Sequence, residues 1–182
     1  MTVYIKFFAA VDGNSTNALM NIIDQKVAAG YKKIVLLIST PGGSVFHGLS
    51  IHNYLVGIPL EIETHNFGSV DSIGVVIFSA GTKRYSAPDA RFLLHPVSVN
   101  LTANTNLEAE KLEEITKGLK IDTENIAATI AKASNKTKEE LIKTISARTT
   151  LNPEQAKVFG LVHEIKKDLF PLGSEIITIN AS

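Results

Sequence analysis

The residue that best fits a chemical role is Ser72, which stands between a predicted strand and a predicted buried helix. The alternating run Leu60–His65 leads in as a strand, Gly68 allows a sharp turn, and the apolar stretch after Ser72 ends at Gly81. A serine at such a strand–turn–helix corner forms a nucleophile elbow, in which the hydroxyl is lifted away from the backbone. The first N–H groups of the helix are then free to bind an oxyanion.

Two further segments supply the partners that a nucleophilic serine needs. The apolar run Ile34–Ile38 leads into Thr40–Ser44, where Gly42 and Gly43 let the backbone approach a ligand closely. Another apolar run ends on His95. Because parallel strands bring their C-terminal ends to one edge of a sheet, we expect the three positions to meet there. A hydroxyl, an imidazole and preset amide donors together favour acyl transfer.

Each of these residues also has a structural interpretation. Serine is a common helix cap, and Asp71 could take that place instead. Glycine in a strand–helix turn and histidine at a strand end are both frequent without any catalytic role. Short Gly/Ser patterns are weak signals, and the diglycine turn lacks the lysine of a P-loop and the spacing of a dinucleotide-binding motif. The functional prediction therefore depends on the arrangement of the whole chain.

The composition is that of an ordinary folded domain. The chain has 182 residues, 45% hydrophobic and 20% charged, and its formal net charge is zero, which favours neither nucleic acid nor an anionic membrane as a partner. It has no cysteine, so disulfides, thiolate catalysis and zinc–thiolate sites are excluded. The N-terminus lacks a signal-peptide pattern, and no apolar run approaches the roughly 20 residues that span a bilayer. We expect a cytoplasmic protein.

Strands and helices alternate along the chain, which predicts an α/β fold with a mainly parallel sheet in a single domain over residues 1–182. Its core is expected over about 3–100 and 145–182, and a long amphipathic helix at about 107–133 is expected to project in part. The predicted strands are 3–9, 34–38, 60–65, 83–86, 90–95, 161–165 and an edge strand at 175–179. The predicted helices are 16–29 with Ser15 as its cap, 45–56, 72–80 and 107–133, with two short helices that begin near Thr137 and Asn152.

Five short blocks in register resemble ClpP, the proteolytic subunit of the Clp protease, within the ClpP/crotonase superfamily. The blocks are TPGGSV at 40–45, GSVDSIG at 68–74, AG at 80–81, RFLLH at 91–95 and QAKVFGLV at 155–162. The resemblance covers about residues 3–165. It implies a divergent member of that family, with a spiral of ββα units and a protruding handle helix.

The resemblance also implies a serine peptidase that cleaves short or unfolded peptides. Carried over residue by residue, it makes Ser72 the nucleophile and His95 the general base. It assigns the oxyanion hole to the backbone N–H groups of Gly43 and Ile73. It implies a homo-oligomeric ring, in which two rings meet through the handle helices.

The chain departs from the family at the third catalytic position. The family has an aspartate in the segment before its last helix, and that position falls at Arg148, with no carboxylate in residues 147–151. A wrong imidazole tautomer can cost about 10⁴-fold in kcat, so we expect weak activity. The hydroxyl of Thr149 or Thr150, a backbone carbonyl, or a distant acid such as Asp122 are alternatives for orienting the histidine.

Two further departures concern substrate and partner. His95 is followed directly by Pro96, and the polar segment 97–106 replaces the glycine-rich strand that aligns the bound peptide in the family. The first predicted strand already begins at Val3, without the family's pore-lining extension. This argues against docking to an AAA+ unfoldase, although the resemblance implies such a partner.

No metal site and no cofactor are predicted. His47 and His52 are five residues apart on one helix, which does not place them on the same face. His65 and His163 lie in predicted strands without an acidic partner at ligand spacing. We therefore expect these four histidines to be structural.

Three other functions fit parts of the pattern. A catalytically degenerate scaffold or regulatory subunit would explain the missing acid. An acyl-CoA enzyme of the crotonase type shares the oxyanion-hole logic but needs carboxylates in its pocket. A Ser–Lys peptidase would need Lys111 or Lys117 of the long helix to reach Ser72.

Overall fold

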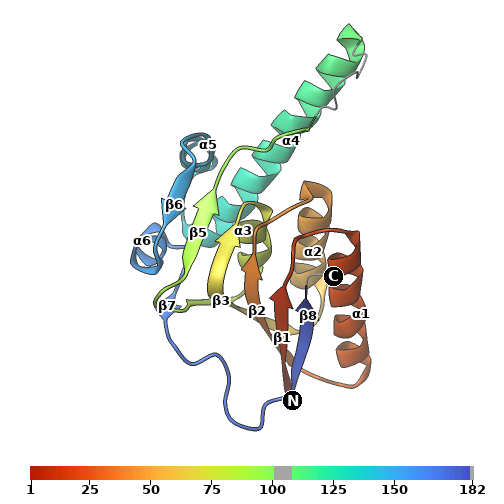
Figure 1. Ribbon diagram of the computed structural model, residues 1–182, viewed down its shortest axis with the longest axis vertical. Coiled ribbons are helices and arrows are strands. Elements are labelled where there is room, and N and C mark those ends of the chain that lie inside the picture. The colour runs from red at the N-terminus through yellow and green to blue at the C-terminus, as the bar shows by residue number, and fades with distance from the viewer. Residues whose placement is uncertain (101–107, 181–182) are drawn as a thin grey trace.

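The computed structural model describes residues 1–100 and 108–180, which form a mixed sheet with helices packed against it (Figure 1). The strands are β1 Thr2–Phe8, β2 Lys33–Thr40, β3 Glu61–Asp71, β4 Lys83–Ser86, β5 Arg91–Leu94, β6 Thr149–Leu151, β7 Glu164–Ile165 and β8 Ile176–Asn180. The helices are α1 Gly13–Ala28, α2 Val45–Gly57, α3 Ile73–Phe78, α4 Ala109–Ser134, α5 Lys138–Ser146 and α6 Pro153–Phe159.

The sheet brings the ends of three strands to one edge. Its strand order is β6-β5-β3-β2-β1-β8, with β4 paired to β3 and β7. Strand β3 is shared, because its first part pairs with β4 while Ser69–Asp71 pairs with Arg91–Leu93 of β5. Both of these pairings and the β2–β3 pairing are parallel. Strands β2, β3 and β5 therefore end at the same edge of the sheet, and the antiparallel strand β6 begins there beside the end of β5.

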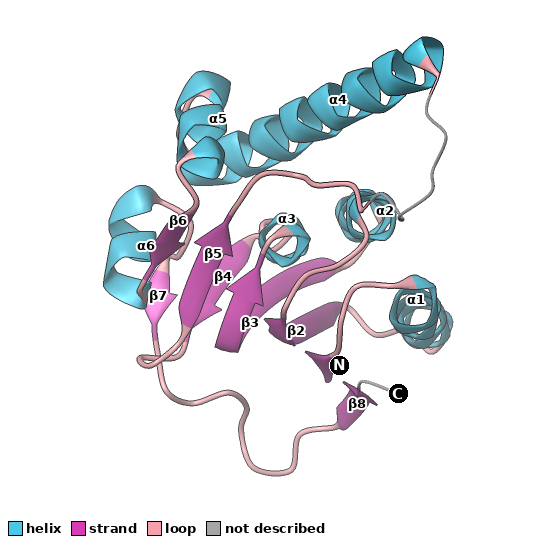
Figure 2. Ribbon diagram, turned by 45° about the horizontal axis from the view of Figure 1, so that its top comes forward, coloured by secondary structure: helices cyan, strands magenta, loops and turns pink. Residues whose placement is uncertain are grey.

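The core lies between the sheet and the helices α1, α2 and α3, which cover one face of it (Figure 2). Strand β2 is a continuous apolar run, and Ile34, Leu36 and Ile38 are fully buried. Every residue of α3 is buried as well. A short helix enclosed in this way has little freedom, so the corner at its start is rigid.

Helix α4 projects from this body (Figures 1 and 2). At about 1.5 Å per residue, its 26 residues span about 39 Å. Its buried residues lie only in the second half, from Ile126 onward, where the helix packs against α3 and α5. The first half is largely exposed, as the sequence predicted.

Arg84 of β4 ties the C-terminal elements to the sheet. Its guanidinium is buried and donates hydrogen bonds to the carbonyl groups of Gly81, Ala133, Gly160 and Leu161. Two of these acceptors follow α6, and one lies in the last turn of α4. One side chain therefore anchors both helix ends, which fixes where α5, β6 and α6 lie.

Three details differ from the sequence predictions. Helix α1 is capped by Asp12, and Ser15 is the reciprocal partner in that capping box. Strand β3 does not turn at Gly68 but continues to Asp71, because β5 supplies a hydrogen-bonding partner there. Strand β7 has two residues, since the segment before it bonds to Arg84 instead. Residues 97–100 form no regular element, and the remainder of the predicted loop 97–106 lies outside the described residues.

Candidate active site

Ser72 occupies the corner between β3 and α3 in a strained backbone conformation. Its φ is 58° and its ψ is −127°, a region that a non-glycine residue adopts at a cost of about 1–3 kcal/mol. Its N–H donates to the carbonyl of Leu93 on β5 at 2.7 Å, which holds the corner against the neighbouring strand. Its side chain makes no capping hydrogen bond to α3. Ser72 therefore stands at the N-cap position of α3 but does not cap the helix through its side chain.

The diglycine turn after β2 packs directly against this corner. A Cβ atom on Gly42 would lie 2.7 Å from Ser72 Cβ and 2.8 Å from the carbonyl oxygen of Asp71. A Cβ on Gly43 would collide with the carbonyl of Val11. Both glycines also have positive φ, 87° and 149°. Only glycine fits at these two positions, and this lets the backbone of one turn contact the serine of the next.

Two backbone donors around the corner have no acceptor within the described residues: the N–H groups of Gly43 and Ile73. The neighbouring N–H groups are engaged, that of Gly42 with Thr40 Oγ1 at 3.1 Å and that of Ser72 with β5. Ile73 is the first residue of α3, where an N–H has no partner within the helix. The free donors are the pair that the sequence resemblance assigned to an oxyanion hole.

His95 follows the last residue of β5 at the same sheet edge. Asp71 of β3 is paired with Leu93 of β5, so Ser72 and His95 lie one and two residues beyond a matched pair on adjacent strands. Neighbouring strands are about 5 Å apart. No hydrogen bond joins the Ser72 hydroxyl to the imidazole in the part of the chain that the structure describes. The backbones of Ser72 and His95 are therefore close, and their side chains are not hydrogen-bonded to each other among the described residues.

The group that contacts His95 Nδ1 is the backbone carbonyl oxygen of Pro96, at 2.9 Å. When Nδ1 carries the hydrogen and donates to this carbonyl, Nε2 is left as the acceptor that a general base requires. Among the alternatives that the sequence left open, the structure therefore shows a carbonyl. The hydroxyl of Thr149 is engaged elsewhere, since it donates to the carbonyl of Thr144 at 2.8 Å.

The antiparallel pairing of β5 with β6 ends at Leu94 and Thr149, which are the chain neighbours of His95 and Arg148. The observed pairs are Phe92–Leu151, Leu93–Thr150 and Leu94–Thr149. Arg148 is exposed and has a φ of 53°, at the turn between α5 and β6. A cation therefore stands at the position that the resemblance assigned to the catalytic acid.

An ion pair that the sequence analysis missed braces the two strands carrying Ser72 and His95. The carboxylate of Asp71 accepts from Arg91 Nη2 and from Ser69 Oγ, both at 2.7 Å. Asp71 is only 7% exposed. The sequence feature that could have indicated this ion pair is the placement of Ser69 and Asp71 on the same face of one strand, with Arg91 as the first residue of a neighbouring strand.

Three of the other four histidines make structural contacts. Nδ1 of His52 lies 2.8 Å from the carbonyl oxygen of Val76, and Nε2 of His65 lies 3.2 Å from that of Lys166. Burial lowers the pKa of His65 to about 4 and also lowers the pKa of His52. His163 packs against Arg84, and burial together with that positive charge lowers its pKa. Burial therefore disfavours the charged form of all three imidazoles.

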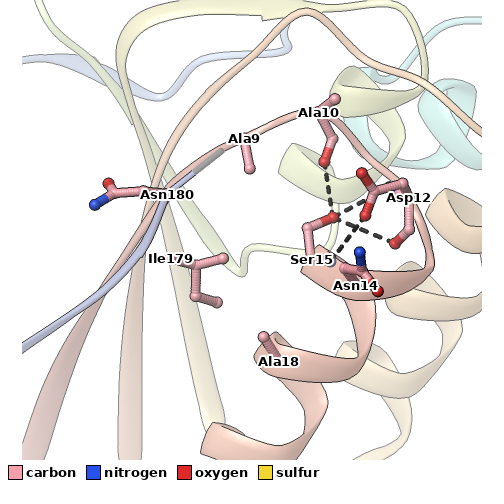
Figure 3. Close-up of a pocket in the computed structure, with 8 residues that line it drawn as sticks. All are labelled: Ala9, Ala10, Asp12, Asn14, Ser15, Ala18, Ile179 and Asn180. Carbon is pink, nitrogen blue, oxygen red and sulfur yellow. Dashed lines mark hydrogen bonds between the residues drawn. The ribbon is translucent and has the colours of Figure 1, made fainter. Parts of the chain in front are cut away.

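Two hollows lie near the sheet edge, and neither is lined by Ser72 or His95. One of about 430 Å³ is lined by Phe8, Ala9, Ala10, Ser39, Thr40, Pro41, Ser69, Asp71 and Arg91. Figure 3 shows the other, of about 270 Å³, between the end of β1, the start of α1 and β8. Its polar side chains include Ser15, whose hydroxyl donates to the carbonyl of Ala10 at 2.7 Å.

Within residues 1–100 and 108–180, no three His, Asp or Glu side chains gather closely enough to hold a metal ion. None of the helices described there combines the length and the apolar composition needed to cross a bilayer. Lys111 and Lys117, the candidates for a Ser–Lys pair, lie on the exposed first half of α4, and Lys111 pairs with Glu114 at 2.8 Å.

Comparison with known proteins shows the family of this chain. The model of the Clp protease family matches residues 4–168. The chain belongs to the Clp protease family. Among curated relatives, the ATP-dependent Clp protease proteolytic subunit 2 of Corynebacterium efficiens is 31% identical over 139 residues, 74% of this chain and 66% of that protein. Subunit 1 of Streptomyces avermitilis is 30% identical over 141 residues, 75% of this chain and 62% of that protein.

A solved Clp structure shows the same fold. A point mutant of ClpP1 from Listeria monocytogenes superposes with a TM-score of 0.79 at 24% sequence identity, over 92% of this chain and 91% of that chain. The predicted α/β class, the Clp-like architecture and the divergent character of this member are confirmed. The Clp family is a family of peptidases, whereas the roles of individual residues in this chain remain predictions.

Proposed function

We propose that this Clp-family chain is a serine peptidase that hydrolyses bonds in short or unfolded peptides. The observation that carries the proposal is the strained and uncapped Ser72 corner, with two unpaired amide donors beside it among the described residues. Backbone strain of this kind persists only where the surrounding structure maintains it, and it is concentrated at functional sites. A serine that merely ended a strand would require neither the strain nor the glycines packed against it.

In the proposed reaction, Ser72 Oγ attacks the carbonyl carbon of the scissile bond while His95 Nε2 takes the hydroxyl proton. The carbonyl oxygen becomes an oxyanion, which accepts hydrogen bonds from the N–H groups of Gly43 and Ile73. One such donor is typically worth about 10²–10³ in kcat. The imidazolium then protonates the leaving amine as the C–N bond breaks, and water releases the acyl group from Ser72 by the same steps.

The Pro96 carbonyl is proposed to replace the usual carboxylate as the group that orients His95. It selects the correct tautomer, but it carries no charge with which to stabilise the imidazolium. Hydrogen bonds between charged partners are roughly twice as strong as neutral ones. We therefore expect a slow peptidase rather than an inactive one.

Labelling with a fluorophosphonate tests the proposal directly, because the reagent bonds to an activated serine. The wild-type chain is expected to be labelled once, and Ser72→Ala and His95→Ala are each expected to abolish labelling. Ser50→Ala, which removes a serine from the interior of α2, is the matched control and should be labelled like the wild type. Labelling that survives Ser72→Ala would contradict the proposal.

A second candidate is a non-catalytic scaffold or regulatory subunit. It is favoured by the absence of a bond between Ser72 and His95 in the described residues and by the cation at Arg148. A folded chain that is not labelled at any pH would support this candidate. Nothing observed favours the acyl-CoA enzyme, because the carboxylate nearest the corner, Asp71, is engaged by Arg91.

The proposal includes a homo-oligomeric ring in the cytoplasm that forms through the projecting half of α4. Leu112 and Ile121 there are 46% and 49% exposed, which is unusual for large apolar side chains on one helix. Light scattering of the wild type and of Leu112→Lys tests this. A wild-type mass equal to one chain would contradict it.

A further inference from the structure

We propose that Arg148 binds a carboxylate of the substrate close to the scissile bond, so that this chain selects acidic peptides or the free C-terminal end of a peptide. The inference rests on the proposed peptidase function and names the substrate class of that same site. The shared chemistry is a carboxylate held by a guanidinium. The experiment below distinguishes its two sources, an acidic side chain and a terminal carboxylate.

The first support is placement. The pairing of β5 with β6 ends one residue short of both His95 and Arg148. The last observed pair, Leu94 and Thr149, is directly opposed, so the backbones of the adjacent residues His95 and Arg148 lie close together. The backbone of Arg148 is well fixed, because its N–H donates to the carbonyl of Ile145 at 3.1 Å and the adjacent Thr149 hydroxyl bonds to Thr144. The Arg148 side chain therefore starts from a fixed backbone position near that of His95.

The second support is that this guanidinium has no partner among the described residues. The chain contains three arginines. Arg84 is buried among carbonyl groups, and Arg91 is paired with Asp71. Arg148 is exposed and makes no ion pair or side-chain hydrogen bond within the residues that the structure describes. It is the arginine that remains available to a ligand.

The third support is that Arg148 is not needed to orient the histidine. His95 Nδ1 already contacts the Pro96 carbonyl, and a guanidinium has no acceptor with which to replace it. What a guanidinium does offer is a planar fork of donors that matches a carboxylate. The position is therefore suited to recognition of the substrate.

The negative charge of a substrate carboxylate is expected to raise the rate of the chemical step as well as the affinity of the substrate. His95 becomes positive in the transition state, and the positive charge of the neighbouring Arg148 repels it, which slows the reaction. A substrate carboxylate bound to Arg148 neutralises the guanidinium and so offsets this repulsion when the imidazolium forms. An acidic substrate is therefore expected to have a higher kcat as well as a lower KM.

The experiment compares matched fluorogenic peptides with wild-type enzyme. One series exchanges Gln for Glu at each position near the scissile bond, and the other exchanges a C-terminal amide for a free carboxylate. A hydrogen bond between charged groups corresponds to about a tenfold or greater preference in kcat/KM. Preference within the first series assigns the ligand to a side chain, and preference within the second assigns it to a terminus.

Three variants assign the preference to Arg148. Arg148→Asn and Arg148→Asp introduce residues that tolerate the left-handed φ of 53°. The first is expected to bring the acidic-to-neutral ratio close to one, whatever its absolute rate, and the second to favour a lysine-containing peptide instead. Lys143→Gln, which removes an exposed cation from the last turn of α5, should leave the ratio as in wild type.

Failure of this inference is distinct from failure of the proposed function. A wild type that cleaves both members of each pair equally, or an Arg148→Asn variant that keeps the preference, overturns the inference and leaves the peptidase. If no peptide is cleaved, fluorescence anisotropy of the same labelled peptides with Ser72→Ala protein decides the matter. Carboxylate-dependent binding that Arg148→Asn removes supports the inference, and equal binding overturns it.

Discussion

Replacement of Gly42 by alanine tests whether the diglycine turn positions Ser72, the proposed catalytic serine. The new Cβ would lie 2.7 Å from Ser72 Cβ and 2.8 Å from the carbonyl oxygen of Asp71, both tighter than real carbon atoms tolerate. Because the second neighbour is backbone, the corner itself has to move. The change therefore acts on the geometry of Ser72 without removing any proposed catalytic group.

Two contributions make up the expected effect. The positive φ of 87° costs an alanine about 1–2 kcal/mol of stability, and the close contacts add to this. Gly30 separates the two contributions, since its φ is 78° and a Cβ there would meet nothing within 4 Å. A displacement of about 1 Å at a reacting group costs about 10²-fold in rate. Gly30→Ala should therefore lose stability alone, while Gly42→Ala should lose both stability and about 10²-fold in labelling rate.

The assay pairs urea unfolding with the rate of fluorophosphonate labelling under conditions in which each variant is folded. Thr40→Val is a milder companion if Gly42→Ala folds poorly, because it removes the hydroxyl that accepts from the Gly42 N–H at 3.1 Å. Loss of this bond should cost about 1 kcal/mol and a smaller fraction of the labelling rate. Gly42→Ala protein labelled at the wild-type rate would refute the idea that this turn supports the nucleophile.

Three further changes test the scaffold of the site. Asp71→Asn breaks the pair with Arg91, and because Arg91 is half-exposed we expect a loss of about 1–3 kcal/mol in urea unfolding together with slower labelling. Arg84→Met removes the side chain that anchors the C-terminal helices. It should lower the free energy of unfolding, measured in urea, by at least about 3 kcal/mol. The lowered pKa of His65, about 4, means that the unfolded chain binds more protons below its ordinary value of 6.5. Stability should therefore fall by up to about 3 kcal/mol as pH drops from 6.5 to 4, and His65→Asn should flatten that slope.

Features set by local hydrogen bonding were predictable from the sequence. Thr137 and Asn152 each begin a short helix through a reciprocal capping box, as their spacing to a Glu or Gln three residues later indicated. The meeting of three strand ends was predictable as well, because it follows from the parallel order of the sheet. Ser15 was misassigned for a related reason: a capping box has two members, and the sequence does not say which one is the cap.

Features set by pairing between distant segments were not predictable. Gly68 suggested a turn, but β3 continues because Arg91–Leu93 arrives to pair with its last residues. The approach of Arg148 to His95 depends on the pairing of β6 with β5, which no local pattern encodes. Pro96 is a departure from the family pattern that is visible in the sequence. The contact of its backbone carbonyl with His95 Nδ1 was not predictable, because a pattern of side chains does not show which carbonyl group a ring nitrogen contacts.

The proposed site divides its tasks in an unusual way. The nucleophile and the oxyanion donors are fixed by two rigid turns, and the tautomer of the base is set by a neutral carbonyl next to it in sequence. These parts require no acidic residue, so a guanidinium at Arg148 is compatible with the proposed catalysis. Its effect is to place a positive charge near His95, where a triad has a negative one. In a triad the protein supplies the negative charge that stabilises the imidazolium. In this chain we infer that the substrate supplies it, so recognition of a carboxylate and stabilisation of the transition state become the same interaction, and removal of the substrate's carboxylate should impair both together.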